Sequence, residues 1–402
     1  MFKDLKVIKL IVIVGLLLAI LFKIDFLQKS VYQLYTDKHS YEKNDQIKIY
    51  ATSKAKYPIF SKTSLTDLQG NKIQEIELDL SYSQKEPEDV LLKGDESEKF
   101  IDFRLSTEMN SGIYLIAHKY PILITDNNLS DVTIVYPAMN NLINQKVEER
   151  TAITLKYEKT SFNRGVEIDD YTLGMKPVFE YIKTHCTVNY ISDLDIENYK
   201  KIENTNNLVI YGKSGFWTPK MKSNLKKFIT NGGNVLFICS YALNNVCWYD
   251  ESNNAVTLYD KTRANAIESW LGYNGDDPRF VIGATYLFGG TSDHSEYNII
   301  DKSHPIFNGI NQLSLTSDLY NSSSVIWNDN IPEIDTRDTL FYSQKILAFN
   351  KSITPYGDNG VKGIFEHQPD TTSGKIINLG SEDWCLKEDK TLIINSINYL
   401  LK

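Results

Sequence analysis

Apolar positions in the second part of the chain come in short, nearly continuous runs separated by stretches with helical spacing. Residues 208–211 form one such run, a helix is predicted from Thr218 to Thr230, and a second apolar run leads to Cys239. Apolar runs of this length are typical of parallel strands buried on both faces. Because strands alternate with helices, the sequence after residue 129 predicts a doubly wound, mostly parallel α/β sheet, closed by a last helix over residues 390–401.

A different pattern precedes this region. Between residues 31 and 128 polar and apolar residues alternate in short segments, as at 46–50 and 111–117, and turn residues such as Gly70 and Asn71 separate them. Alternation with period two predicts strands with one buried face. Regularly spaced short strands over about a hundred residues favour a β-sandwich.

The first thirty residues carry the longest apolar run. Residues 10–22 are all apolar, with Lys9 just before them and Lys23 just after. A spanning helix needs about 20 residues, so this segment predicts a single-pass membrane anchor over residues 1–30. The positive-inside rule then places the bulk of the chain outside the cytoplasm, periplasmic or extracellular. A cleaved signal peptide is the alternative, because its apolar core has a similar length.

Composition narrows the class of function. The 402-residue chain has a net charge of -8 and lacks the Lys/Arg cluster that a phosphate backbone requires, which argues against nucleic-acid binding. Its four cysteines stand singly, without the CxxC spacing of a zinc site. We therefore expect no metal. The hydrophobic patterns described above divide the chain into three predicted parts: an anchor (1–30), a β-sandwich (31–128) and an α/β domain (129–402).

The carboxyl ends of parallel strands are where open α/β sheets bind ligands. Aromatic and polar residues gather at these predicted positions, and aromatic faces framed by polar groups suit a small ligand or a glycan. The predicted ligand cleft consists of Met139, Asn140, Lys213, Ser214, Phe216, Trp217, Tyr241, Glu382 and Trp384.

Three residues are candidates for catalysis. Cys239 ends a predicted strand and His367 precedes another, so the two would form a nucleophile and base if the fold held them within hydrogen-bond reach. Asp383 follows the last predicted strand and is a candidate acid. Other acidic pairs, such as Asp169-Asp170 and Asp193-x-Asp195, are interpreted as loop residues or helix caps.

A series of motifs, in a fixed order, carries a family resemblance. They are Ser111-Gly112-Ile113-Tyr114, Tyr136-Pro137-Ala138-Met139-Asn140, Ser161-Phe162-Asn163-Arg164, Gly212-Lys213-Ser214-Gly215-Phe216-Trp217, Asn231-Gly232-Gly233-Asn234, Trp270-Leu271-Gly272, His304-Pro305-Ile306-Phe307 and Gly380-Ser381-Glu382-Asp383-Trp384. This order resembles the large subunit of N,N-dimethylformamidase. The resemblance implies a sandwich followed by a glutamine-amidotransferase-like, flavodoxin-like domain. It also implies an iron, held by two tyrosines and a glutamate, that activates water to hydrolyse a small amide.

The chain departs from that family at the metal ligands. Where relatives carry Gly-His-x-Glu-Tyr-Trp, this chain has Gly215 and Phe216 in place of the glutamate and the tyrosine, and Met139 replaces the tyrosine of Ala-Tyr-Asn. Neither glycine nor phenylalanine coordinates iron. We therefore expect no cofactor and a non-catalytic binding or scaffolding protein of the cell envelope.

Two further expectations remain. The family's enzyme pairs its large subunit with a small one, so the resemblance implies a protein partner; a homo-oligomer is the alternative. The alternative function is a hydrolase of amide or glycan bonds with a site near Cys239, His367 and Asp383.

Overall fold

The computed structural model describes most of the chain after residue 30. The described residues are 31–53, 59–82, 89–90, 93–94, 100–104, 109–145, 159–258, 270, 273, 278–283, 296–315, 325–328, 331–334, 344–353 and 359–402. The predicted anchor over residues 1–30 lies outside them.

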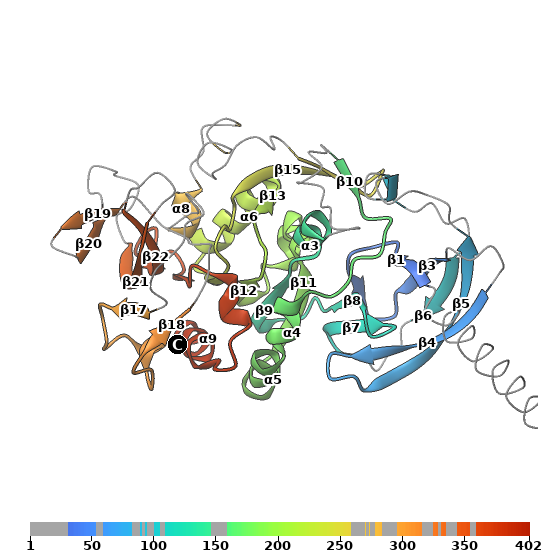
Figure 1. The fold of residues 1–402 in the computed structure, drawn as a ribbon, viewed down its shortest axis with the longest axis horizontal. Coiled ribbons are helices and arrows are strands. Elements are labelled where there is room, and N and C mark those ends of the chain that lie inside the picture. The colour runs from blue at the N-terminus through green and yellow to red at the C-terminus, as the bar shows by residue number, and fades with distance from the viewer. Residues whose placement is uncertain are drawn as a thin grey trace, which may run out of the picture.

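The amino-terminal strands form one eight-stranded sheet, at the blue end of Figure 1. Its order is β1-β3-β5-β4-β7-β8-β2, and β6 pairs with β3. The strands are β1 (Val31–Thr36), β2 (Tyr41–Glu42), β3 (Gln46–Ser53), β4 (Ile59–Asp67), β5 (Lys72–Tyr82), β6 (Phe100–Arg104), β7 (Gly112–Ile116) and β8 (Tyr120–Thr125).

Alternation along these strands places their apolar residues in a common core. Ile47 and Ile49 of β3 are fully buried and pack with Leu78 of β5 and Ile122 and Ile124 of β8. The predicted β-sandwich has only weak support, because a short parallel pairing of β3 with β5 links all these strands into one sheet.

A nine-stranded sheet forms the centre of the molecule, in the order β11-β9-β12-β14-β23-β22-β21-β17-β18. The five strands β11, β9, β12, β14 and β23 pair in parallel, whereas every later pairing is antiparallel. The strands are β9 (Ser130–Tyr136), β11 (Val188–Ser192), β12 (Thr205–Tyr211), β14 (Asn234–Ile238), β17 (Glu296–Ile299), β18 (Leu313–Ser314), β21 (Lys345–Ile353), β22 (Asn359–His367) and β23 (Ile376–Asn378).

The predicted fold class, a doubly wound α/β sheet after a sandwich and a transmembrane helix, is therefore wrong. The described chain is mostly β, and its central sheet is mixed. Two short 3-10 turns, Asp193–Glu197 and Tyr199–Lys201, replace a helix between β11 and β12. The helices are α3 (Ala138–Asn144), α4 (Asp170–Gly174), α5 (Lys176–His185), α6 (Pro219–Thr230), α8 (Arg279–Ile282) and α9 (Thr391–Leu400).

Smaller sheets complete the described chain. A four-stranded sheet has the order β10-β16-β15-β13, and β19 pairs with β20 near the end of the molecule opposite the blue strands (Figure 1). The strands are β10 (Lys159–Ser161), β13 (Phe216–Trp217), β15 (Asn245–Asp250), β16 (Ala255–Leu258), β19 (Val325–Asn328) and β20 (Ile331–Ile334).

The helices of the described residues do not support the prediction of a single-pass membrane protein. A helix needs about 20 predominantly apolar residues to cross the hydrocarbon core. The longest helix within the described ranges, α6, has 12 residues, and none of the helices described is long and apolar enough to span a membrane.

One buried hydrophobic cluster extends across both large sheets. Leu115 of β7 and Leu123 of β8 belong to the same buried cluster as Phe179 of α5 and Tyr190 of β11. A hydrogen-bond network joins the sheets at the same place, since Asn189 Oδ1 accepts from Ser111 Oγ at 2.7 Å and from the Asp126 backbone N–H at 2.8 Å. The division at residues 128 and 129 stays a prediction.

Candidate functional site

A pocket of about 450 Å³ opens beyond the carboxyl ends of β9 and β12. This is the edge at which parallel sheets bind ligands. The described residues that line it are Asn141, Asn144, Gln145, Glu167, Ile168, Asp169, Asp170, Tyr171, Lys213 and Leu386. Amide, carboxylate and ammonium groups thus surround a space large enough for a small organic molecule.

Two chain turns bring these residues together. After β9, Pro137 precedes α3, which carries Asn141 and Asn144 to the pocket. After β12, Gly212 turns the chain with φ of +70°, a conformation that glycine adopts without steric cost. A Cβ at Gly212 would lie 3.6 Å from both Pro137 and Tyr171, so the turn packs closely between them and delivers Lys213 to the pocket.

Asp169 organises the pocket wall. Its carboxylate caps α4, accepting from the Thr172 backbone N–H and from Thr172 Oγ1, each at 2.8 Å. Asn141 Nδ2 also donates to Asp169, at 2.5 Å, while Thr172 Oγ1 lies 3.0 Å from the hydroxyl of Tyr211. Three hydrogen bonds thus hold the Asp169 carboxylate in place. The sequence analysis interpreted Asp169-Asp170 as loop residues or a helix cap, and Asp169 is the cap of α4.

Tyr171 supplies an aromatic side of the pocket. Burial raises the pKa of its hydroxyl well above the usual value, and the charges of Glu382 and Asp383 act in the same direction. The phenol is therefore protonated at neutral pH and can donate a hydrogen bond. The exposed side chain of Leu386 adds an apolar surface to the same pocket.

The polar residues on the other wall are partly occupied within the protein. Asn144 Nδ2 donates to the Asn140 carbonyl at 2.7 Å, and Glu167 forms an ion pair with Lys119 at 2.6 Å. The side-chain amide of Gln145 donates to the Gly165 carbonyl through its nitrogen and accepts from the Glu167 N–H through its oxygen. Asp170, by contrast, is exposed in the first turn of α4, where its charge faces solvent and the pocket.

Of the nine residues predicted to form the ligand cleft, Lys213 lines this pocket. Seven others are buried side chains of the interior: Met139, Asn140, Ser214, Phe216, Trp217, Glu382 and Trp384. Tyr241 is half-buried and packs against Gly215. The aromatic residues at the strand ends therefore serve mainly as packing rather than as a stacking surface for a ligand.

Hydrogen bonds within the protein explain why the polar members of that set are buried. The Asn140 side chain bonds both the N–H and the C=O of Phe216, at 2.8 and 3.1 Å. Glu382 accepts from the N–H and the hydroxyl of Ser240, at 3.0 and 2.6 Å. The indole of Trp384 donates to the Leu379 carbonyl at 2.9 Å.

The structure does not bring Cys239 and His367 together. His367 and Val235 both lie opposite Ile376 of β23, on its two sides, and Cys239 follows Val235 by four residues. Four residues of strand span about 13 Å, which is well beyond hydrogen-bond reach. Burial also raises the pKa of the Cys239 thiol well above its usual value, which disfavours the nucleophilic thiolate.

Asp383 lies closer to the pocket than the other two catalytic candidates. It is half-buried, and its charge acts on Tyr171, which lines the pocket. Its own backbone N–H bonds Ser381 Oγ at 3.2 Å. The position of Asp383 makes it a neighbour of the pocket rather than one of its described lining residues.

The residues present do not fit the iron site that the family resemblance implies. A Cβ at Gly215, where relatives carry the glutamate, would lie 2.4 Å from Cδ2 of Tyr241. Phe216, where they carry a tyrosine, is buried and offers no ligand atom. Among the residues that the structure describes, no group of three or more His, Cys, Asp or Glu side chains is arranged to hold a metal ion.

Sequence reasoning missed most of the described pocket. Asn141, Asn144, Gln145 and Glu167 carry no motif, because they reach the site through the ends of α3 and the loop before α4. Lys213 could be identified from the sequence because it directly follows a predicted strand. The same signal applied to the helix after β9 would have identified Asn141 and Asn144.

Comparisons with known proteins name no family. No family model matches the chain, and no curated protein matches it. Among solved structures, it is similar to a ThuA-like protein from Bacteroides uniformis, with 10% identity, a TM-score of 0.36, and coverage of 67% of this chain and 90% of that one.

Two other solved structures resemble the chain with similar identities and TM-scores. A cytoplasmic protein from Salmonella typhimurium has 12% identity and a TM-score of 0.33, with 68% of this chain and 99% of that one covered. A β-galactosidase from Bacillus circulans sp. alkalophilus has 12% identity and a TM-score of 0.35, with 68% of this chain covered but only 30% of the galactosidase. Likenesses this weak carry no functional argument.

Proposed function

We propose that this protein is a non-catalytic binding protein whose pocket at the carboxyl ends of β9 and β12 takes a small polyhydroxylated ligand, such as a saccharide. The observation that carries the proposal is the composition of the pocket wall. It combines amide and carboxylate acceptors with the protonated phenol of Tyr171, the ammonium group of Lys213 and the apolar side chain of Leu386.

Saccharides require this mixture of groups. Their hydroxyls are bonded by side-chain amides and carboxylates, and the apolar face of the ring packs on aromatic or aliphatic carbon. Glu167, Asp169 and Asp170 outnumber Lys213 in the described wall, so the pocket favours neutral or amino sugars over acidic ones.

The ordered motifs of the sequence support a relation to the dimethylformamidase large subunit, and we propose that this chain shares that origin without the iron chemistry. The close contact between Gly215 and Tyr241 supports the loss of the glutamate ligand. The separation of Cys239 from His367 leaves the alternative hydrolase without its nucleophile and base.

Isothermal titration of the full chain with glucose, glucosamine, N-acetylglucosamine and short N-acetylglucosamine oligomers tests the proposal. We expect saturable binding of at least one sugar and recovery of that sugar unchanged after long incubation. Lys213→Met and Asp170→Asn should each weaken binding by about 10- to 150-fold, since each removes a charge-assisted hydrogen bond of roughly 1.5–3 kcal/mol.

The matched control is Lys220→Met, which removes an exposed lysine at the start of α6, away from the described pocket wall. Binding by this variant should equal that of the wild type. Equal weakening in all three variants, or no binding of any sugar, would contradict the proposal. Release of hydrolysed sugar would establish the hydrolase alternative instead.

A further inference from the structure

The wall of the polar pocket beyond β9 and β12 contains both engaged and free polar groups. Four of its described residues bond partners within the protein: Asn144, Gln145, Glu167 and Asp169. The side chains of Asp170, Tyr171 and Lys213, in contrast, form no hydrogen bond or ion pair with any residue that the structure describes. Those three groups are therefore free to bond a ligand.

Asn141 adds a fourth free group, in a fixed orientation. Its side chain is buried, with 6% of its surface exposed. Its Nδ2 donates to the hydroxyl of Tyr136 at 3.3 Å and to the carboxylate of Asp169 at 2.5 Å, and these two bonds fix the orientation of the amide. Its Oδ1 has no partner among the described residues and yet is not sealed from solvent. Because Asn141 lines the pocket, Oδ1 is an acceptor that opens to it.

Negative charge surrounds this part of the wall. The Asp169 carboxylate lies against the amide of Asn141, and Asp170 is the next residue of the chain. Burial raises the pKa of the Tyr171 phenol, and the charge of Glu382 acts in the same direction. An acceptor beside carboxylates bonds a positively charged donor more strongly than a neutral one. This part of the wall therefore favours a cationic group on the ligand.

Lys213 supplies the opposite charge from a different element. It follows β12, whereas Asn141 belongs to α3 and Asp170 to α4. Lys213 forms no ion pair with any acid in the described part of the chain, so its ammonium group does not neutralise the carboxylate of Asp170 directly. A ligand between them meets acceptors and negative charge on one side and a positively charged donor on the other.

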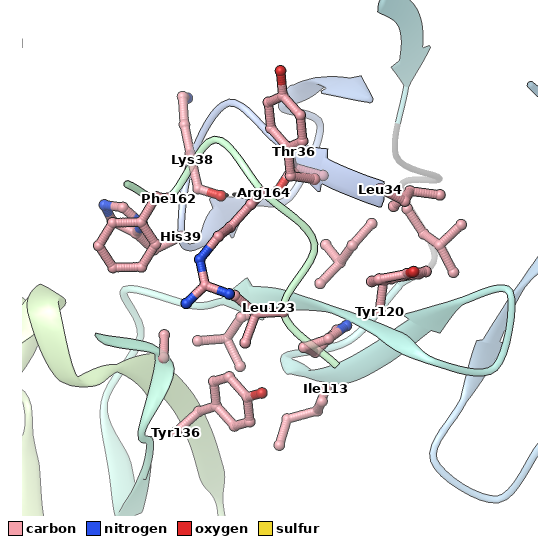
Figure 2. Close-up of a pocket in the computed structure, with 16 residues that line it drawn as sticks. Leu34, Thr36, Lys38, His39, Ile113, Tyr120, Leu123, Tyr136, Phe162 and Arg164 are labelled. Atoms are coloured by element: carbon pink, nitrogen blue, oxygen red, sulfur yellow. Dashed lines mark hydrogen bonds between the residues drawn. The ribbon is translucent and has the colours of Figure 1, made fainter. Parts of the chain in front are cut away.

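A smaller cavity beside the amino-terminal sheet is less suited to a ligand. Its volume is about 70 Å³, which leaves room for a few water molecules. Figure 2 shows Arg164 among the residues around it, and the two nitrogens of Arg164 that lack a hydrogen-bond partner, Nε and Nη1, are sealed from solvent. Of the two spaces, the polar pocket of about 450 Å³ has both the room and the free groups.

We propose that the saccharide bound in the polar pocket is an amino sugar with a free amine, whose ammonium group is held by Asn141 Oδ1 and the Asp170 carboxylate while Lys213 donates to a hydroxyl. An ammonium group has three donors and no acceptor, so it suits a wall that presents acceptors. The ring of Tyr171 on the same wall also favours a nearby cation. The inference rests on the proposed function and specifies which saccharide the pocket takes.

Isothermal titration of the full chain compares sugars that differ at the amine. Glucosamine and galactosamine are matched with glucose and galactose and with their own N-acetyl derivatives. We expect at least one amino sugar to bind about tenfold more tightly than its neutral counterpart and its N-acetyl derivative, because charge-assisted hydrogen bonds are the stronger ones. Neutral or N-acetyl sugars that bind as tightly as both amino sugars would overturn the inference and leave the proposed function standing. No binding of any sugar would overturn both.

Substitutions of Asp170 test the charge. Asp170→Asn should reduce the preference for the amino sugar from about tenfold to about twofold, whereas Asp170→Glu keeps the charge and should retain most of it. Asp170 is exposed and makes no side-chain bond within the described residues, so both variants should fold as the wild type does. The matched control is Glu203→Gln, at an exposed acid before the amino end of β12, which should keep the preference. An unchanged preference in Asp170→Asn would refute the assignment.

Asn141→Leu tests the second acceptor. It should reduce the preference for the amino sugar, and it should also lower the thermal midpoint, because Asp169 loses one hydrogen bond. Thr172→Val removes another hydrogen bond of Asp169 and leaves the Asn141 acceptor in place. It should lower the thermal midpoint as well but keep the preference. Loss of the preference in both variants, or in neither, would contradict the role of Asn141 in binding the amine.

Discussion

At the scale of single residues, acidic side chains that follow strands serve the backbone of neighbouring elements. Asp193 follows β11 and is 1% exposed. Its carboxylate accepts from the backbone N–H groups of Met139, Asn140 and Leu194, at 2.9, 3.2 and 3.0 Å. The sequence analysis interpreted Asp193 as a loop residue or helix cap. In the structure its carboxylate accepts hydrogen bonds from backbone N–H groups in the first turn of α3, which have no partner within that helix.

The burial of Asp193 predicts a pH dependence of stability. Burial raises its pKa to about 6, above the value of about 3.9 for an unfolded chain. The folded state therefore holds the proton more tightly, and the stability that this group contributes is fully present below about pH 4. It falls as the pH rises through 6, by about 3 kcal/mol in total.

Urea unfolding of the wild type and of Asp193→Asn between pH 4 and 7.5 measures this effect. The asparagine does not titrate, so the free energy of unfolding of the wild type should fall relative to that of the variant as the pH rises. Other buried acids, such as Glu382, are present in both proteins and cancel in the comparison. A difference that does not change with pH would refute the assignment.

At the scale of elements, α6 illustrates where local sequence is sufficient. The sequence predicted a helix from Thr218 to Thr230, and the helix runs from Pro219 to Thr230 with Thr218 as its cap. Thr218 Oγ1 accepts from the Met221 N–H at 3.2 Å and donates to Glu197. Capping residues, a proline in the first turn and an apolar face act within a few residues, so the sequence displays them directly.

Loss of this cap should destabilise the protein. Thr218→Ala removes both hydrogen bonds and should lower the free energy of unfolding by about 1–2 kcal/mol, whereas Thr218→Ser should restore most of it. The matched control is Ser223→Ala at an exposed position of the same helix, which should be nearly neutral. Denaturant unfolding with an unchanged slope checks the expectation; equal effects at Thr218 and Ser223 would contradict it.

At the scale of the whole molecule, the buried contact between the two large sheets predicts cooperative unfolding. Asn189 of β11 is 4% exposed, and its amide bonds Ser111 together with the backbone of Asp126. Asn189→Ala leaves the partly buried backbone groups of Asp126 without their side-chain partner and should cost about 1–3 kcal/mol. Because one buried cluster extends across both sheets, calorimetry should show a single transition at a lower temperature.

The control variant is Asn253→Ala. Asn253 is exposed, and its side chain contacts only the turn that contains Asp250. Its thermal midpoint should stay close to that of the wild type. Two separate transitions in the wild type would show that the parts divided at residues 128 and 129 unfold independently. That result would support the predicted domain boundary and contradict the shared cluster as a source of cooperativity.

The sequence by itself determined the local elements of this protein: the buried strands around residues 208–211 and 234–238, the helix after Thr218, and the short alternating strands before residue 128. These depend on periodicity, caps and turns, which act over a few residues. Only the tertiary structure decided that β22 and β21 extend the central sheet antiparallel, since strand pairing joins residues far apart in the chain. It likewise decided that Trp217 and Trp384 are interior packing, because burial depends on every segment that packs around a side chain.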